Sequence, residues 1–321
     1  MVNVMNEKWT IILRTQGKNC ELELKNALNS LIAQEYKKFS VILTIHTKNK
    51  LDIENTLYFI RPFQKMIPIE PIIVKNKQGN RSHPLNVALQ KIDCQYLSFL
   101  DDDDIYYPNF GRDLIDALKT SQKKFAFGSS IDVINKIEEN FTGEKYLYTV
   151  SKSRRKYQPF NKCLLMLDNF IPFNSFLIDT SIIGKTKFNE NMPYLEDWDF
   201  IKNLSIKKNF SYIQIKGPVS EYRRRNDDTD TYNEKTYYKW VEANNITRKD
   251  FEDKIISIKI KDLYELKDPY LQTINQQDKY IKILEHRFSN KLRKKLKQIS
   301  FIDNTLGKII RKIRHIVVKI K

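Results

Sequence analysis

Short runs of apolar and β-branched residues alternate with amphipathic segments along the first third of the chain. Residues 9–15 (WTIILRT) and 39–47 (FSVILTIHT) are typical of buried strands, and residues 21–36 between them place leucines on one helical face. The alternation continues with a strand, a short helix and a strand at residues 69–80, 81–92 and 95–100. Such alternation predicts an α/β fold with a mainly parallel sheet flanked by helices, in which ligands bind at the carboxyl ends of strands.

The remainder of the chain is less regular. Further strand patterns occur at residues 124–135, 144–153, 174–183 and 210–225, so we expect the sheet to be mixed rather than wholly parallel. Beyond about residue 247 the composition becomes helical, charged and rich in Lys and Ile. We therefore predict an α/β domain over residues 1–250 and a helical, basic, amphipathic region over residues 251–321.

Composition limits the kind of protein this can be. With 321 residues, 41% of them hydrophobic, the chain can bury one large core. Its cysteines, Cys20, Cys94 and Cys163, lack the paired spacing of a zinc or redox site, which indicates reduced thiols and a cytoplasmic location. Neither a secretion leader nor an apolar run of about 18 residues is found, so a membrane span is not expected.

The formal net charge of +17 is concentrated near the C-terminus. Residues 283–321 hold twelve Lys or Arg against two acids, and residues 307–321 place isoleucines and valines on one helical face and basic residues on the other. This pattern is typical of a helix lying in an anionic membrane surface. A helix that docks on the rest of the chain or on a partner would give the same pattern. Nucleic acid is not expected, because the segment has few aromatic residues.

Four consecutive carboxylates, Asp101 to Asp104, follow the strand at residues 95–100. An isolated acidic run is usually a solvated turn or a helix cap. Here, however, a strand delivers it to the edge of the sheet where ligands bind. Carboxylates with phosphate oxygens are the usual ligands of Mg²⁺, so the run also fits a site for a metal bound to a nucleotide diphosphate.

Four segments, in this order and at these separations, resemble the family 2 glycosyltransferases of the GT-A fold. They are IILRTQGK with the helix and strand that follow it, GNRSHPLNVAL, YLSFLDDDDIYYPNF and YLEDWDF, and the resemblance spans roughly residues 9–225. It implies transfer of a sugar from a nucleotide-sugar to an acceptor hydroxyl, with inversion at the anomeric carbon and with the help of Mg²⁺ or Mn²⁺.

The resemblance assigns roles to the donor site. Asp101 and Asp103 match the two acids of the family's DxD motif, so both are expected on the metal, with Asp101 also near the ribose. Thr15 matches a position that lines the nucleotide pocket. Arg81 is a candidate for binding the pyrophosphate, although a surface arginine in a polar loop is the more common explanation of such a residue. Many members carry acids at the end of the second strand where this chain has His46, which is expected as a pocket wall and leaves GDP- and dTDP-sugars open beside uridine donors.

The segment EDWDF supplies the predicted catalytic group. Asp197 matches the family's general base, and Glu196 and Asp199 are its competitors for the acceptor or for capping the following helix. Trp198 is interpreted either as a sugar platform or as a core residue.

A basic loop follows the last predicted strand. The family that the chain resembles often carries a Tyr-Arg pair there, in a loop that can fold over the donor, so Arg223, Arg224 or Arg225 is expected to stabilise the departing diphosphate. A solvated loop paired with nearby acids explains them equally well.

Together these features predict an inverting glycosyltransferase in the synthesis of bacterial surface polysaccharide, lipopolysaccharide or capsule. Its acceptor would be a glycan or a lipid-linked sugar, and it would be bound peripherally to the inner face of the cytoplasmic membrane. The alternative is a non-catalytic basic binding module with a transferase-like fold that associates with membrane or nucleic acid. The sequence does not indicate an oligomeric state.

Overall fold

The computed structural model describes residues 8–18, 21–77, 79–155, 158–225 and 237–266. The chain divides into two compact units, residues 1–258 and 259–321. All elements discussed below belong to the first unit. The amphipathic segment predicted at residues 307–321 lies outside the described residues.

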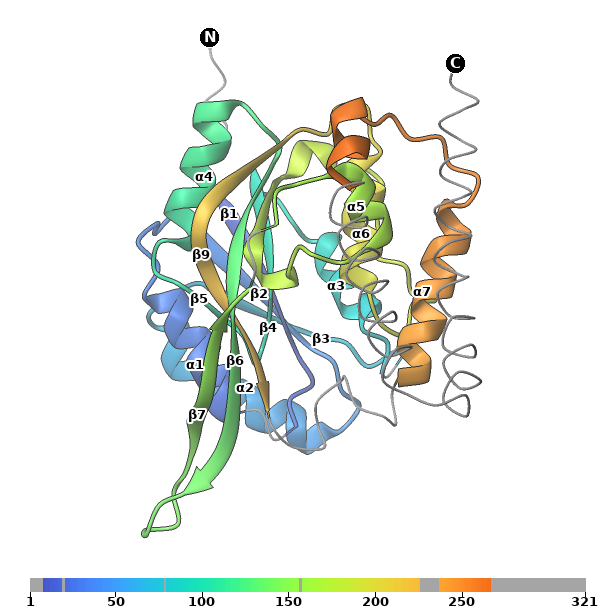
Figure 1. Cartoon of the computed structure of the whole chain (residues 1–321). Coiled ribbons are helices and arrows are strands. Elements are labelled where there is room, and N and C mark those ends of the chain that lie inside the picture. The colour runs from blue at the N-terminus through green and yellow to red at the C-terminus, as the bar shows by residue number, and fades with distance from the viewer. Residues whose placement is uncertain (1–7, 19–20, 78, 156–157, 226–236, 267–321) are drawn as a thin grey trace, which may run out of the picture. The chain divides into compact units, whose positions relative to one another are not determined.

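The first unit is built on one sheet of nine described strands with helices on both of its faces (Figure 1). The strands are β1 (Trp9–Thr15), β2 (Phe39–Ile45), β3 (Ile69–Ile73), β4 (Tyr96–Asp101), β5 (Ile105–Tyr106), β6 (Phe125–Glu139), β7 (Lys145–Arg154), β8 (Phe176–Asp179) and β9 (Tyr212–Arg225). The helices are α1 (Glu21–Ile32), α2 (Lys50–Gln64), α3 (Ser82–Leu89), α4 (Phe110–Ser121), α5 (Lys162–Leu167), α6 (Glu196–Ser205) and α7 (Tyr237–Phe251), with 3₁₀ turns at Phe173–Ser175 and Thr180–Ile182.

The strand order creates a crevice at the ends of β1 and β4. The order is β3-β2-β1-β4-β8-β6-β9-β5, with β7 paired to β6. Strands β3, β2, β1 and β4 are parallel, and β8 then runs antiparallel between β4 and β6. The chain steps outward from β1 to β3 and returns to the other side of β1 as β4. Ligands of such sheets bind at this switch point, outside the carboxyl ends of the strands.

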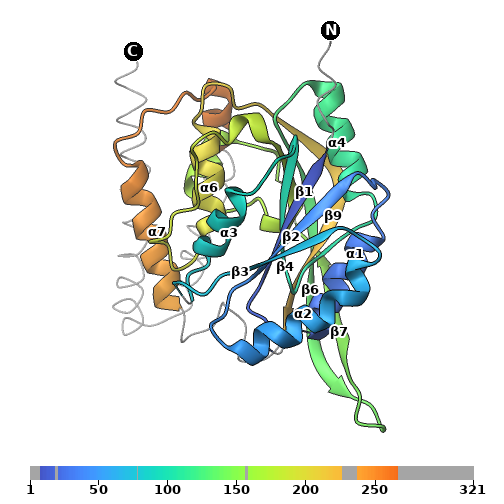
Figure 2. The same ribbon diagram turned by 180° about the vertical axis from the view of Figure 1, so that it is seen from behind.

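Alternate residues of β1 pack into different halves of the core. Ile11 and Leu13 lie in a cluster with residues of α1, α2 and α4, whereas Ile12 lies in a cluster with residues of α3, α5, α6 and α7. Figures 1 and 2 show these two groups of helices on opposite faces of the sheet. Helix α4 packs so closely that a Cβ at Gly111 would lie 2.4 Å from the ring of Trp9, which only glycine avoids.

The predicted fold class is confirmed: the sheet is mixed, has a parallel core and is flanked by helices on both faces. Helix α2 was not predicted from the pattern, because only Ile53, Thr56 and Ile60 of its fifteen residues are buried and the apolar stripe is narrow. Among the described helices, none combines the length and apolarity needed to cross a membrane.

Candidate active site

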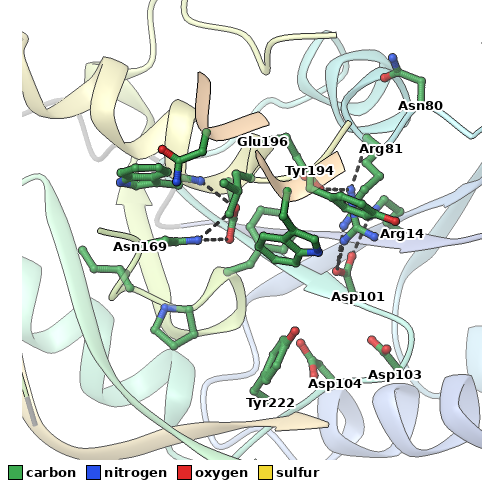
Figure 3. Close-up of a pocket in the computed structure, with 18 of the residues that line it drawn as sticks. Arg14, Asn80, Arg81, Asp101, Asp103, Asp104, Asn169, Tyr194, Glu196 and Tyr222 are labelled. Carbon is green, nitrogen blue, oxygen red and sulfur yellow. Dashed lines mark hydrogen bonds and ion pairs between the residues drawn. The ribbon is translucent and has the colours of Figure 1, made fainter. Parts of the chain in front are cut away.

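A pocket of about 900 Å³ opens at the carboxyl ends of β1 and β4. Its walls come from distant parts of the chain: the ends of these two strands, the loop before α3, the segment around Asn169, the start of α6 and one face of α7. Figure 3 shows two groups of polar side chains in it, with Arg14 and Asp101 on one side and Asn169 on the other. The volume suits a ligand of nucleotide-sugar size, at the upper end of the range for small-molecule sites.

Two arginines and two carboxylates form a buried network on one wall of the pocket. Arg14, the penultimate residue of β1, donates two parallel hydrogen bonds to Asp101, from Nε to Oδ1 at 2.7 Å and from Nη2 to Oδ2 at 2.8 Å. Glu196 accepts hydrogen bonds from Arg14 Nη1 at 2.9 Å and from Arg81 Nε at 2.8 Å. Burial alone would raise the pKa of Glu196, but the charges of Arg81 and Arg14 overcome it and lower the pKa to about 2. Glu196 is therefore ionised and charge-paired, which makes it a weaker proton acceptor than an ordinary glutamate.

The four consecutive carboxylates have four different surroundings. Asp101 is held by Arg14, and Asp102 accepts a hydrogen bond from Thr15 Oγ1. Asp104 is buried and accepts a hydrogen bond of 2.7 Å from the backbone N–H of Arg223. Burial and the charge of Asp103 hold the pKa of Asp104 well above its usual range. Asp104 is thus a structural link between β4 and β9.

Asp103 lines the pocket with the other three and is the most exposed of the four residues. Water reaches its side chain, yet the surrounding protein atoms and the neighbouring charges of Asp102 and Asp101 raise its pKa to about 8. A carboxylate that is hard to ionise beside other carboxylates is a position where a cation is favourable.

The donor set fits a divalent metal only in combination with a ligand. Within the described residues, no group of three or more Asp, Glu, His or Cys side chains is arranged to hold a metal ion. Mg²⁺, however, commonly uses one or two carboxylates, completed by phosphate oxygens and water. Asp103 and Asp101, which both line the pocket, match that requirement, and the raised pKa of Asp103 agrees with a cation bound there.

Asp197 follows Glu196 on the first turn of α6 and is bound by Asn169, on the side of the pocket opposite Arg14 and Asp101 (Figure 3). The preceding Leu195 has φ +62°, a left-handed conformation that is uncommon for a side chain of this size and turns the chain sharply into the helix. The Asp197 carboxylate accepts hydrogen bonds from the Trp198 N–H at 2.8 Å and from Asn169 Nδ2 at 3.3 Å. Burial and the adjacent charge of Glu196 raise the pKa of Asp197 to about 6. A carboxylate of this pKa is ionised at neutral pH and still basic enough to take a proton.

The other residues predicted for this motif face elsewhere. Trp198 is 2% exposed and donates its indole N–H to the Leu165 carbonyl at 2.6 Å, so it is a core residue whose edge reaches the pocket. Asp199 does not line the pocket, because its carboxylate accepts hydrogen bonds from Asn203 Nδ2 and Thr247 Oγ1 on the far side of α6. The structure therefore brings Asp197 and Glu196 to the site but not Asp199.

The predicted basic residues also divide into two groups. Arg81 lines the pocket, whereas Arg223 and Arg224, both in the described part of the chain, are not among its lining residues. Arg223 is bound by Glu221 at 2.7 Å. Arg155 lines the pocket near them and lies over the ring of Tyr222, 4.8 Å from its centroid.

His46 lines the pocket with Thr15, and its Nε2 lies 3.0 Å from the Asn76 carbonyl. Burial lowers the pKa of His46, so the ring is neutral near pH 7.

Sequence reasoning did not identify several pocket residues. Arg14 was detectable, because a basic side chain inside an otherwise apolar buried strand requires a charged partner. Asn169, Tyr194 and Trp240 gave no local signal. Tyr194 and Trp240 stack with ring centroids 5.2 Å apart and planes inclined by 16°, and they belong to segments that only the fold brings together.

Comparison with known proteins agrees with this architecture. The chain resembles Staphylococcus aureus TarS, with 15% identity, 78% of this chain and 40% of TarS covered, and a TM-score of 0.52. The structure of TarS 1–349 with UDP-GlcNAc gives 16% identity, 78% and 68% coverage, and a TM-score of 0.54. The mannosyltransferase PcManGT of Pyrobaculum calidifontis with GDP-Man and Mn²⁺ gives 11% identity, 78% and 65% coverage, and a TM-score of 0.50. The match thus covers 40% of that TarS chain, and at these identities the likeness concerns the fold alone.

Sequence comparison supplies the family. No curated protein matches the chain significantly. The sequence model described as Glycosyl transferase family 2 matches residues 17–180, just over half of the 321 residues. That match includes the strand-end carboxylates and the whole parallel core of the sheet after β1, and it agrees with the fold of the structural neighbours. The chain belongs to glycosyl transferase family 2.

Proposed function

We propose that the chain transfers a sugar from a nucleotide-sugar to an acceptor hydroxyl with inversion at the anomeric carbon. The observation that carries the proposal is Asp197, a carboxylate with a pKa of about 6 in the same pocket as the arginines and acids at the strand ends. A single-displacement transfer needs one group to accept the hydroxyl proton and a separate charged region to stabilise the leaving diphosphate. The two sides of this pocket supply these two parts.

On the donor side, basic groups face the expected diphosphate. Arg81 and Arg155 line the pocket, and Arg81 reaches it while held by Glu196. Guanidinium groups bind phosphate oxygens through paired, charge-assisted hydrogen bonds. We assign the diphosphate to these residues in place of Arg223 and Arg224.

Asp101 and Asp103 would hold Mg²⁺ or Mn²⁺ together with the donor phosphates. When bound there, the metal would neutralise charge that develops on the leaving diphosphate. Asp101 would keep its bond to Arg14, which fixes its orientation. The neighbour PcManGT was solved with Mn²⁺, which supports a divalent metal for this chain.

On the acceptor side, Asp197 would accept the proton of the attacking hydroxyl as its oxygen bonds to the anomeric carbon and the bond to the diphosphate breaks. Asn169 donates to both Asp197 oxygens and orients the carboxylate. The raised pKa makes proton transfer more favourable than it would be to an ordinary aspartate.

The donor base is proposed to be uracil or guanine. The neighbours were solved with UDP-GlcNAc and with GDP-Man, and His46 in this chain provides a neutral wall beside Thr15. A neutral wall does not select one of these bases by charge.

We further propose that the acceptor is a glycan or lipid-linked sugar of the bacterial surface, with the enzyme held at the inner face of the cytoplasmic membrane. The support is the sequence of residues 307–321, whose isoleucines and valines share one helical face and whose basic residues share the other. The extension over residues 251–321 would then be the anchor and residues 1–250 the catalytic part.

The test is release of nucleotide diphosphate from a panel of UDP-, GDP- and dTDP-sugars, with Mn²⁺, with Mg²⁺ and with EDTA. Turnover of one donor that requires metal and is lost in the Asp197→Asn variant is expected. Absence of turnover for every donor, together with binding of the protein to anionic vesicles or nucleic acid, would support the non-catalytic alternative instead.

A further inference from the structure

Two buried carboxamide oxygens lack a hydrogen-bond partner among the described residues, and both line the pocket. They are Oδ1 of Asn169 and Oδ1 of Asn244. A buried acceptor without a partner is destabilising, and native proteins keep few of them. Their presence in the same pocket as Asp197 suggests that a bound ligand supplies the missing donors.

The orientation of Asn169 is fixed by chemistry. Its Nδ2 donates to the two oxygens of Asp197 at 3.4 and 3.3 Å. An ionised carboxylate only accepts hydrogen bonds, so the amide nitrogen, and not the amide oxygen, must face Asp197. The oxygen of Asn169 is therefore an acceptor beside the proposed base, and it requires a donor from the ligand.

Helix α7 brings Asn244 to the pocket in a fixed position. Lys202 of α6 is 1% exposed and donates to Thr247 Oγ1 of α7 at 3.0 Å. Its ammonium group lies 4.5 Å from the ring centroid of Trp198 and 4.0 Å from that of Phe251, so the two helices are joined by a buried cation. Asn244 is on the joined helix, so its backbone is held beside the pocket.

The same helix contributes an aromatic surface. Trp240, one helical turn before Asn244, stacks on Tyr194, and both line the pocket. An aromatic surface combined with a few fixed polar groups is the usual composition of a small-molecule site. Hydroxyl groups are the neutral donors that match unpartnered amide oxygens.

We propose that Asn169 and Asn244 form an acceptor subsite that binds a second hydroxyl group beside the one that reacts. The inference rests on the proposed function, because the reacting hydroxyl is the one that donates to Asp197. The amide nitrogen and oxygen of Asn169 are bonded to the same carbon atom, so they lie close together. While the reacting hydroxyl of the acceptor donates to Asp197, a hydroxyl on the adjacent acceptor carbon therefore reaches Asn169 Oδ1. The acceptor class is thus a sugar or polyol with adjacent hydroxyls.

The first experiment compares methyl hexosides with their monodeoxy analogues as acceptors for the donor identified by nucleotide release. Loss of one hydroxyl next to the reacting one is expected to lower acceptor kcat/KM at least tenfold, because the site's buried acceptor is then left unpaired. In Asn169→Ala the same comparison should give a difference of less than about threefold. Equal use of both acceptors by the wild type would overturn the subsite.

The second experiment uses Asn244→Leu, which removes the unpartnered oxygen, and Asn244→Asp, which keeps an oxygen acceptor. Asn244→Leu is expected to raise the acceptor KM about tenfold with donor KM within twofold. It should leave Tm unchanged or higher, since Asn244 Oδ1 has no hydrogen-bond partner among the described residues. Asn244→Asp should restore most of the acceptor affinity. Asn29→Leu, at an exposed position of α1 outside the pocket, is the matched control.

The outcomes separate the two proposals. The subsite would be overturned if Tm fell by several degrees in both Asn244→Leu and Asn244→Ala, or if the acceptor KM stayed unchanged. Donor turnover by these proteins would leave the proposed function standing. Failure of the wild type to turn over any donor would overturn the proposed function itself.

Discussion

Replacing Asp197 by Asn removes the proposed proton acceptor while keeping the size of the side chain. The amide oxygen can still accept a hydrogen bond from the Trp198 N–H or from Asn169, so the start of α6 should keep its geometry. Loss of a general base typically reduces the rate by about 10²- to 10⁴-fold. We expect kcat for transfer to fall within that range and the Kd for the donor to stay within about threefold.

The pKa of Asp197 gives this prediction two further readouts. In the wild type, kcat/KM for the acceptor should rise with pH through about 6, since the ionised form is the base, and this limb should be absent in the variant. The upward shift from 3.8 to about 6, caused by burial and by Glu196, corresponds to a cost on the order of 3 kcal/mol for the ionised form in the folded state.

This cost has a definite pH dependence. The folded-state pKa is raised, so the unfolded state releases its proton at lower pH than the folded state does. The destabilisation is absent below about pH 4 and complete above about pH 6. At pH 7 the Asn variant should therefore have a Tm several degrees above that of the wild type, and at pH 4 no advantage.

The assays are steady-state transfer at a series of pH values and thermal unfolding at pH 4 and 7. An unchanged pH–rate limb in Asp197→Asn would refute the assignment. So would a Glu196→Gln variant that stays folded, binds donor normally and still loses more activity than Asp197→Asn.

The remaining predictions address the donor site, the buried network and the tail. Asp103→Ala should abolish metal-dependent binding of UDP or GDP, measured by calorimetry with Mn²⁺. Its Tm should not fall, because the removed carboxylate is repelled by its neighbours. Unchanged binding would remove Asp103 from the metal site. Glu196→Gln should destabilise the fold by about 3 kcal/mol, since it leaves the charges of Arg14 and Arg81 short of a buried partner; denaturant unfolding that matches the wild type would contradict this. Deletion of residues 307–321 removes six Lys or Arg, each worth about 1 kcal/mol near an anionic surface, and should abolish flotation with anionic liposomes without loss of donor turnover. Reduced Tm with unchanged lipid binding would instead favour a tail that packs on protein.

Periodicity alone determined much of the fold. Residues 9–15 were predicted as a strand and form β1 over the same residues, because a continuous run of buried apolar and β-branched residues fits a central parallel strand. The position of the acids at the end of β4 was also a consequence of the pattern, since the apolar run of residues 95–100 stops where the carboxylates begin.

The helical period of the sequence could have shown that Asp197 and Asp199 do not both face the pocket. Asp197 and Asp199 lie two positions apart on one helix, and residues with that spacing point to different sides. Once Asp197 faces the pocket, Asp199 must face away from it, as its hydrogen bonds to Asn203 and Thr247 show.

The charge pairing of the site was decided only by the tertiary structure. Arg14 contacts Asp101 and Glu196 across 87 and 182 residues of chain, and no local pattern specifies such partners. These contacts fix the orientation of Asp101 and make Glu196 a fixed anion, although both belong to acidic runs whose members look alike in sequence.

The residues on the acceptor side could not be predicted from local sequence either. Asn169 comes from an irregular segment, and Asn244 and Trp240 come from a helix outside the part matched to the family. Each is an ordinary polar or aromatic residue in its own sequence context. Sequence determines which elements form and which side of each is buried, because both follow from local propensity and hydrophobic period. Which polar atoms remain without a partner depends on how those elements pack, and only the folded chain reveals it.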